Sequence, residues 1–340
     1  MKTWKLIVLA VSLVIVVIGG AVGGRWYADN RKPNFTGNVD LYVLPQMTTD
    51  EVLVQIPDNL VINHRSLLRV MRREFLDGGL QPGHYLVEKN KPSIYVARML
   101  KFGWQSPVNL VLSGTMRLKD KIACKIGRQM MLDSAEVASA LNDSAMLAHY
   151  GFTPEDVFSL IIPDTYQIYW TASMEDLLDK LKAAYDAFWT PGNLAKAEAL
   201  DLTPKQVSIV ASIVKCESNY VPEYPSIAGV YLNRLRLGMR LQADPTVAFC
   251  YGFKLNRILF KHLEYDSPYN TYLHEGLPPG PICVPDKPSL EAVLNPDRHD
   301  YLYFCASAAL DGTHRFASTL SEHNRNAREF QRALDASGSK

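Results

Sequence analysis

The chain has 340 residues, and its 36 Lys and Arg against 35 Asp and Glu give a net charge of +1. Such a balance provides no bulk electrostatic attraction to nucleic acid, so no nucleic-acid partner is predicted. The length is that of an anchor plus two folded units, and the hydrophobic share of 47% is ordinary for a globular protein. The five cysteines form no CxxC pair and no metal-ligand spacing with His, so we predict free, buried thiols, no metal site and no cofactor. A single disulfide in an oxidising compartment is the alternative for the thiols.

The first segment is predicted to be a transmembrane signal anchor over residues 1–25. Leu6–Gly24 contains no charged residue, and as a helix of about 1.5 Å rise per residue it matches a hydrocarbon layer of about 30 Å. A cleaved signal peptide is the alternative, because Ala21–Gly23 imitates a small-residue cleavage site. The flanking basic residues lie on both sides and decide little, whereas long domains translocate largely regardless of them. A single-pass protein with its body outside the cytoplasm is therefore predicted.

The segment after the anchor is expected to form a tether and a small subdomain. Residues 26–38 are polar and irregular in composition, which predicts the tether, and residues 39–103 follow as the subdomain. Strand, helix, helix and strand patterns succeed one another there, with a further helix behind them. Thr49 or Asp50 is expected to cap the first helix. These elements are expected at Asp40–Leu44, 50–56, Asn63–Phe75, Gly83–Val87 and Ser93–Phe102.

Residues 104–340 are expected to form a larger mixed domain, after a soft boundary at 103–107, so the fold class is α+β. Gly and Pro punctuate alternating helical and short strand patterns throughout this part. The expected elements are a strand at Asn109–Leu112, helices near Arg117–Met131, Ala135–Ala148, Met174–Phe188 and Pro225–Leu237, a turn at Pro163–Tyr166 and a buried strand at Tyr301–Cys305.

A helix that starts at Thr203 carries the most informative acidic residue. Thr203 and Gln206 have capping-box spacing, and Pro204 stands at the first helical position. Glu217 follows the apolar residues of this helix at helical spacing and therefore lies on or beside its buried face. Desolvation there raises the pKa of a carboxyl, as a general acid for glycosidic-bond cleavage requires. The structural alternative is a glutamate that rims the core and pairs with an arginine.

Several later segments combine into a specific resemblance. They include a polar run, Met239–Val247, and a stiff Gly- and Pro-rich loop, Gly276–Ile282, able to form a binding wall. Together these motifs resemble the endolytic murein transglycosylase MltG/YceG-like family, most densely over residues 160–330. The matching segments are Pro163–Tyr166, Ala211–Val214 with Glu217, Asn233–Leu235, Gly238–Gln242, Asp244–Thr246, Pro268–Tyr272, Gly276–Ile282 and Tyr301–Phe304, with His314 and His323 behind them.

The resemblance implies a LysM-like subdomain at 39–103 and a transglycosylase domain at 104–340. It also implies that Glu217 is the catalytic acid/base of a lytic transglycosylase. Such an enzyme cleaves the MurNAc–GlcNAc bond of nascent peptidoglycan strands, leaves 1,6-anhydro-MurNAc ends and limits strand length. One departure from the family pattern is Lys215, where an acidic residue is typical, which leaves the electrostatic neighbourhood of Glu217 open. Substrate contacts are expected at Gln242, Asp244, Tyr269, Asn270 and Thr271, and a purely structural role is an equal alternative for these residues.

The expected partners are peptidoglycan strands and cell-wall synthases of the penicillin-binding class. The expected location is the inner membrane, with the catalytic domain on the periplasmic side. Two rival functions remain open. A hydrolytic muramidase would use Asp244 or Glu223 as its second carboxylate, since glycosidases need two. A non-catalytic wall-binding scaffold would bind glycan regardless of Glu217.

Overall fold

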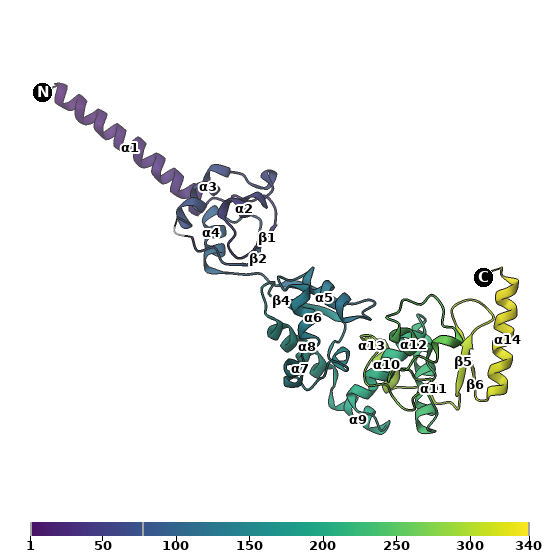
Figure 1. The fold of residues 1–340 in the computed structure, drawn as a ribbon. Helices are drawn as coiled ribbons and strands as arrows, with labels where there is room; N and C mark the ends of the chain where they lie inside the picture. Colours follow the sequence, from purple (N-terminus) through teal and green to yellow (C-terminus); the bar gives the residue numbers. More distant parts are fainter. Residues whose placement is uncertain (1, 77, 339–340) are drawn as a thin grey trace. The chain divides into compact units, whose positions relative to one another are not determined.

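The computed structural model describes residues 2–76 and 78–338 and divides the chain into two compact units. Unit 1 comprises Met1–Asn109 with the short segments Gln129–Met131 and Gln167–Ala172, and unit 2 comprises the remainder. Figure 1 shows the elements in chain order. Within both units helices outnumber the short two-stranded sheets, in agreement with the predicted α+β class.

Helix α1 (Lys2–Asn30) extends away from the body of unit 1 (Figure 1). Its side chains from Thr3 to Tyr27 are exposed, and it is long and apolar enough to cross a membrane once. The prediction of an irregular tether from residue 26 is wrong at its start, because 26–30 continue the helix. Asn34 and Phe35, also assigned to the tether, are buried in unit 1. The apolar ring of Phe35 and the bonded amide of Asn34 explain why this part packs down.

The body of unit 1 has the predicted strand–helix–helix–strand order. Strands β1 and β2 pair antiparallel, from Val39 opposite Val87 to Val43 opposite Gly83. The first helix is capped by Thr48 and not by Thr49 or Asp50, because Thr48 forms a reciprocal capping box with Glu51. The elements are β1 (Val39–Val43), α2 (Thr49–Val54), η1 (Asp58–Leu60), α3 (His64–Glu74), β2 (Gly83–Val87) and α4 (Ser93–Phe102).

Two predictions about residues 135–166, which belong to unit 2, are wrong. The turn expected at 163–166 is instead the start of strand β4, because Tyr166 and Ile168 alternate inward after Pro163. The single helix expected at 135–148 is two helices, since the carboxylate of Asp143 accepts the backbone N–H groups of the next turn and starts a new helix. The elements are β3 (Val108–Leu112), α5 (Lys119–Gly127), α6 (Ser134–Ala140), α7 (Ser144–His149), η2 (Val157–Leu160) and β4 (Asp164–Ile168), with β3 and β4 in one sheet.

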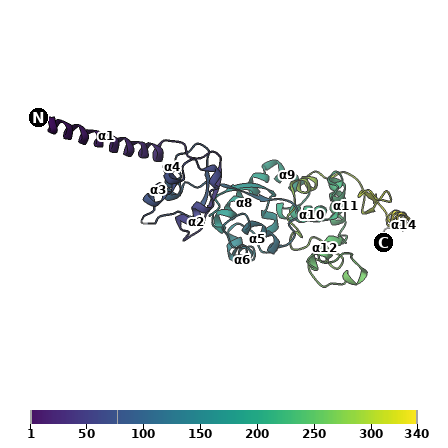
Figure 2. The ribbon, with the colours of Figure 1, turned by 90° about the horizontal axis from the view of Figure 1, so that it is seen from above.

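Helix α10 is the central buried helix among the remaining elements of unit 2. Every residue of α10 from Val207 to Val214 is buried, and the helix packs against α11, α12 and α13 (Figure 1). Figure 2 shows α10, α11 and α12 from a second direction. The expected buried strand at 301–305 is β5, whose residues are all partly exposed, because its sheet has only one further strand. The elements are α8 (Met174–Phe188), α9 (Pro191–Ala199), α10 (Pro204–Glu217), η3 (Val221–Glu223), α11 (Tyr224–Arg236), α12 (Asp244–Cys250), η4 (Phe260–His262), α13 (Lys287–Leu294), β5 (Tyr303–Ala306), β6 (His314–Ala317) and α14 (Leu320–Ala336).

All five cysteines are free thiols, but the prediction that they are buried holds only for Cys283. Cys124 is exposed, because it lies on the outer side of α5 between the buried Ala123 and Ile126.

Candidate active site

Helix α10 begins and ends as its sequence predicts. The Thr203 hydroxyl accepts from the Gln206 N–H at 3.3 Å, and the Gln206 side chain accepts from the Thr203 N–H at 2.8 Å. Ser218 is extended, so the helix ends at Glu217. The acid therefore stands at the end of a fully buried apolar stripe, where the chain turns away from the helix axis. Position alone gives its carboxyl a poorly hydrated environment.

Tyr231 of α11 holds the Glu217 carboxyl. Its buried hydroxyl donates a hydrogen bond to Glu217 Oε1, and its ring meets Phe304 edge-on with centroids 6.0 Å apart. Burial raises the pKa of Glu217 to about 7. The hydrogen bond from Tyr231 lowers this pKa, the negative charge of Asp244 raises it, and the positive charge of Arg234 lowers it. The carboxyl is closely surrounded by protein atoms, while the residue as a whole is only partly buried. A group that titrates near pH 7 and is not sealed inside can exchange protons with a bound substrate.

Arg234, one helical turn after Tyr231, fixes the loops around this carboxyl. Its buried guanidinium donates to the carbonyls of Leu302 at 2.6 Å and Leu241 at 2.8 Å. It also lies over the Tyr303 ring, 5.0 Å from the centroid. One positive charge thus joins α11 to β5 and to the segment after Gly238. Because it acts on Glu217 at the same time, it limits how far burial can raise that pKa.

Gln242 and Asp244 are exposed, and each has a bond to another residue of the candidate site. The Gln242 side-chain oxygen accepts from Arg234 at 3.4 Å. Asp244 is the first residue of α12 and accepts from the Tyr272 hydroxyl at 2.6 Å. Its charge raises the pKa of Glu217, so the two carboxyl groups belong to one electrostatic environment.

Asn270 and Thr271 are buried, and protein groups already use their side chains. Asn270 donates to the carbonyls of Leu263 at 2.9 Å and Tyr265 at 2.8 Å. The Thr271 hydroxyl accepts from the Ala243 N–H at 2.9 Å, which ties the 267–272 segment to the start of α12. These two residues therefore shape the wall of the site, and a direct sugar contact stays a prediction for them.

Tyr269 lies against the core of unit 2, with its ring centroid 4.6 Å from that of Phe249. Burial raises its pKa to about 12, so its hydroxyl stays protonated at neutral pH. The aromatic face makes a sugar contact plausible on chemical grounds, and that contact also stays a prediction.

The Gly276–Ile282 loop is fastened to the body of unit 2. The Ile282 N–H donates to the Ser212 hydroxyl of α10 at 3.0 Å. A Cβ on Gly280 would lie 1.9 Å from the carbonyl oxygen of Glu155, so only glycine fits there. The predicted stiffness of this loop therefore has a structural basis in both contacts.

Two charged residues near Glu217 in sequence are engaged elsewhere. The Lys215 ammonium lies 2.5 Å from a carboxylate oxygen of Asp286, so the departure from the family pattern does not place a positive charge on Glu217. Glu223 accepts from His314 Nδ1 at 2.7 Å and from the His314 N–H at 3.0 Å, with both side chains largely buried. Among residues 2–76 and 78–338, no group of three His, Cys, Asp or Glu side chains is arranged to hold a metal ion.

Sequence reasoning missed Tyr231, Arg234 and Tyr272 as parts of the site. Tyr231 lies within the helix predicted at 225–237, but nothing in its spacing indicated a bond to Glu217. Arg234 belongs to the segment Asn233–Leu235, which was already singled out, but its burial and its bonds to the loop carbonyls were unforeseen. Tyr272 belongs to a segment already singled out, and only its partner Asp244 was unforeseen.

A partly buried glutamate whose carboxyl pKa burial raises to about 7, set between stiff polar loops, defines unit 2 as a candidate acid–base enzyme. The YceG-like family pattern matches residues 41–329, more than half of the chain, so this protein belongs to the YceG-like family.

Curated relatives carry the name endolytic murein transglycosylase. One from Bacillus subtilis (strain 168) is 47% identical over 116 residues, 34% of this chain and 32% of that protein. One from Streptococcus pneumoniae serotype 2 (strain D39 / NCTC 7466) is 31% identical over 174 residues, 50% of this chain and 31% of that protein. The matched part of the chain thus spans about a third of the length of each relative (32% and 31%).

A solved structure has a similar fold. The crystal structure of a YceG-like protein from Listeria monocytogenes aligns with this protein at a TM-score of 0.57 and 28% sequence identity. The alignment covers 85% of this chain and 98% of the Listeria chain.

Proposed function

We propose that the chain is a membrane-anchored endolytic lytic transglycosylase that cleaves peptidoglycan, with Glu217 as its one acid/base. The observation that carries the proposal is the Glu217 carboxyl, whose pKa burial raises to about 7 and whose Oε1 is held by Tyr231. Family membership and the names of the relatives support the substrate class. The apolar helix α1 supports a single-pass anchor. We propose that both units lie outside the cytoplasm.

The proposed reaction uses Glu217 twice. Protonated Glu217 donates to the oxygen of the MurNAc–GlcNAc bond, the bond between that oxygen and C1 breaks, and the GlcNAc-bearing end leaves with the proton. The resulting carboxylate then takes the proton of the C6 hydroxyl on the same MurNAc, whose oxygen bonds to C1. The products are a 1,6-anhydro-MurNAc end and a protonated enzyme ready for the next cycle. A pKa of about 7 suits both steps, because each form is populated at neutral pH.

The surrounding residues would position the glycan and exclude water. Tyr231 orients Oε1 and stabilises the carboxylate after the first step. The exposed Gln242 and Asp244 are the proposed polar sugar contacts, and Tyr269 is the proposed aromatic one. The buried Asn270 and Thr271 shape the wall behind them. Water exclusion by the fastened Gly276–Ile282 loop would favour attack by the C6 hydroxyl over hydrolysis.

Unit 1 is proposed to be LysM-like and to hold the glycan strand during cleavage. Its strand–helix–helix–strand order supports this assignment. Cleavage within strands near the membrane would limit their length as synthases of the penicillin-binding class extend them. Those synthases are the proposed partners, and the inner membrane is the proposed location.

Product analysis of purified peptidoglycan tests the proposal. Digestion in ¹⁸O-labelled water should give internal fragments with 1,6-anhydro-MurNAc ends that carry no label. Glu217→Gln should reduce cleavage by about 10²–10⁴-fold, the contribution of acid–base catalysis. Glu223→Gln is the matched control, since Glu223 is bonded to His314 and lies outside the proposed chemistry. Normal cleavage by folded Glu217→Gln protein would refute the assignment.

Hydrolysis is the second candidate, and one observation favours it. The charge of Asp244 acts on Glu217, so a second carboxylate is close enough to influence the acid. In a hydrolase Asp244 would activate water or the sugar itself, and ¹⁸O would appear at C1 of the new ends. Asp244→Asn would then abolish cleavage as completely as Glu217→Gln, whereas a transglycosylase should retain part of its activity.

A further inference from the structure

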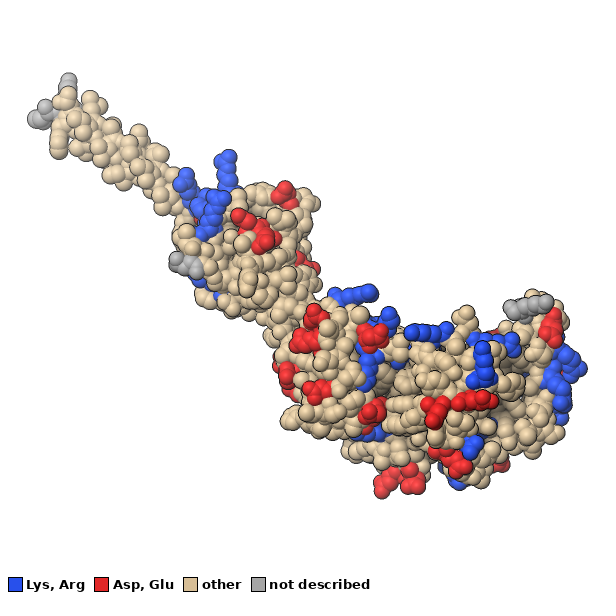
Figure 3. All heavy atoms as spheres, viewed as in Figure 1, with Lys and Arg blue, Asp and Glu red and all other residues tan. Residues whose placement is uncertain are grey.

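Two segments of unit 1 concentrate positive charge beside the base of α1. Residues 25–32 and 64–74 contain seven Lys and Arg but only two acidic residues, Asp29 and Glu74, in a chain whose net charge is +1. We call the surface formed by these segments the basic face. Its basic residues are Arg25, Arg31, Lys32, Arg65, Arg69, Arg72 and Arg73. Figure 3 shows Lys and Arg gathered where α1 meets the body of unit 1.

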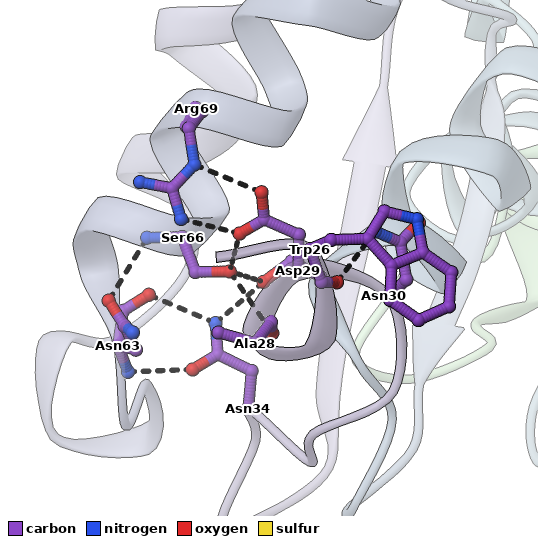
Figure 4. Close-up of polar contacts among 9 residues, drawn as sticks. Trp26, Ala28, Asp29, Asn30, Asn34, Asn63, Ser66 and Arg69 are labelled. Carbon is purple, nitrogen blue, oxygen red and sulfur yellow. Dashed lines mark hydrogen bonds and ion pairs between the residues drawn. The ribbon is translucent and has the colours of Figure 1, made fainter. Parts of the chain in front are cut away.

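A buried polar cluster fixes the two segments to each other (Figure 4). Asp29, in the last turn of α1, has its side chain 5% exposed. It accepts from the Ser66 hydroxyl at 2.7 Å and from two guanidinium nitrogens of Arg69, at 2.9 and 2.6 Å. Asn34 adds bonds to the backbone N–H and carbonyl of Asn63, the residue that caps α3. The end of α1 and the start of α3 therefore form one rigid piece.

This fixed geometry places α3 at the height of lipid headgroups. The uncharged run of α1 ends at Gly24, and Asp29 lies five residues further, about 7–8 Å along the helix axis. A headgroup layer adds about 5–8 Å to each side of the hydrocarbon core. Because Asp29 is bonded to α3, that helix lies at the outer edge of the headgroup layer when α1 spans the membrane. Trp26 and Tyr27, each 56% exposed, fall in the layer itself, where such rings are preferred.

The basic residues are available for an external anion. Among the described residues, no acidic side chain forms an ion pair with Arg25, Arg31, Lys32, Arg65 or Arg72, and all five are exposed. Only Arg69 and Arg73 have acidic partners, Asp29 and Glu74. Five neighbouring positive charges are therefore open to an anion from outside the chain.

We propose that the basic face binds anionic phospholipid headgroups of the membrane in which α1 is embedded. The phosphate diesters of these lipids carry the negative charge, and α1 places the basic face at the level of the headgroup layer. Each basic residue near an anionic membrane contributes about fivefold in affinity, although contributions at one surface do not multiply fully. The face would hold unit 1 against the membrane surface. The inference rests on α1 spanning the membrane and not on the chemistry of Glu217.

Lipid retention by the full chain tests the inference directly. The detergent-purified protein is mixed with equimolar phosphatidylglycerol and phosphatidylcholine of identical acyl chains, and bound lipids are counted by native mass spectrometry. The wild type should retain phosphatidylglycerol with at least a tenfold preference. A variant with Arg31, Lys32, Arg65 and Arg72 changed to Gln should fall to within about twofold of no preference. These four side chains are exposed, and their replacement leaves the Asp29 cluster intact. Equal melting temperatures of variant and wild type verify that the variant is folded.

A matched control separates the basic face from charge in general. Four exposed basic residues of unit 2, Lys180, Lys254, Arg328 and Arg332, are changed to Gln and should leave the preference intact. Equal retention of both lipids by the wild type would overturn the inference, as would an unchanged preference in the basic-face variant or an equal loss in the control. Full competition by glycerol 1-phosphate at the lipid's concentration would also overturn it, by indicating a site for free phosphate esters. The readout is lipid binding, so failure of the transglycosylase proposal would leave this test unaffected.

Discussion

Replacing Glu217 by Gln should stabilise unit 2 at alkaline pH and leave its stability nearly unchanged in acid. Burial raises the pKa of this carboxyl from 4.5 to about 7. Between these values the folded protein binds a proton that the unfolded chain has released, so stability falls as pH rises through this window. Above pH 7 the wild type contains a poorly solvated charge. Gln keeps the shape of the side chain and an oxygen that accepts from Tyr231, but it never becomes charged.

The magnitude follows from the difference between the two pKa values. A shift of about 2.5 units at about 1.36 kcal/mol per unit corresponds to about 3 kcal/mol of lost stability at pH 8. At pH 4.5 the same relation gives only about 0.4 kcal/mol. One kcal/mol moves the melting temperature of a unit this size by about 2–4 °C, so the variant should melt about 6–12 °C above the wild type at pH 8.

Thermal unfolding of the full chain in detergent, followed by near-UV circular dichroism at pH 4.5 and pH 8, provides the measurement. The informative quantity is the melting-temperature difference between variant and wild type at each pH. Glu264→Gln, the same substitution at an exposed position of unit 2, should give equal differences at both pH values. No gain for Glu217→Gln at pH 8, or the same gain at both pH values, would refute the reasoning from desolvation.

Two further predictions concern the immediate neighbours of the acid. Tyr231→Phe removes the hydrogen bond that opposes the raised pKa of Glu217. A hydrogen bond to a charged group is worth about 1.5–3 kcal/mol. The alkaline limb of the pH–rate profile should therefore move to higher pH by about one to two pH units. Tyr224→Phe on the same helix is the control, because that hydroxyl donates to the Ser218 carbonyl and should leave the limb in place. Cys216 and Cys283 have sulfur atoms 3.3 Å apart, so diamide treatment of the folded chain should cross-link this pair, and peptide mass spectrometry that found only other pairs would contradict the prediction.

Local signals in the sequence predicted local structure well. The cap at Thr203, the helix from Asn63 to Phe75 and the strand at 83–87 depend on neighbouring residues alone, and all three are confirmed. The wrong predictions concern places where two local signals favour different structures. At Asp143 the side chain caps a new helix although the helical periodicity is continuous, and after Pro163 the alternating pattern forms a strand instead of a turn. Propensity alone gives no measure of which alternative wins.

The environment of Glu217 was predictable only in part. Its burial follows from the spacing of residues within its own helix, whereas its partners come from another helix. Helical spacing indicated that the carboxyl faces the core, and burial raises its pKa in the expected direction. The groups that oppose the rise, Tyr231 and Arg234, come from the next helix. Their role depends on the packing of α10 against α11, which no spacing within either helix specifies.

Arg234 shows most clearly why the rest of the site lay beyond sequence reasoning. A buried guanidinium without partners is too costly to expect on an inward helix face. The structure meets that cost with the carbonyls of Leu302 and Leu241, one of them 68 residues away along the chain. Loops that must bring carbonyls to Arg234 are held in place around Glu217 by the same bonds. The charge that lowers the pKa of the acid is therefore also the charge that assembles its surroundings, so that position and acidity of the carboxyl depend on one residue.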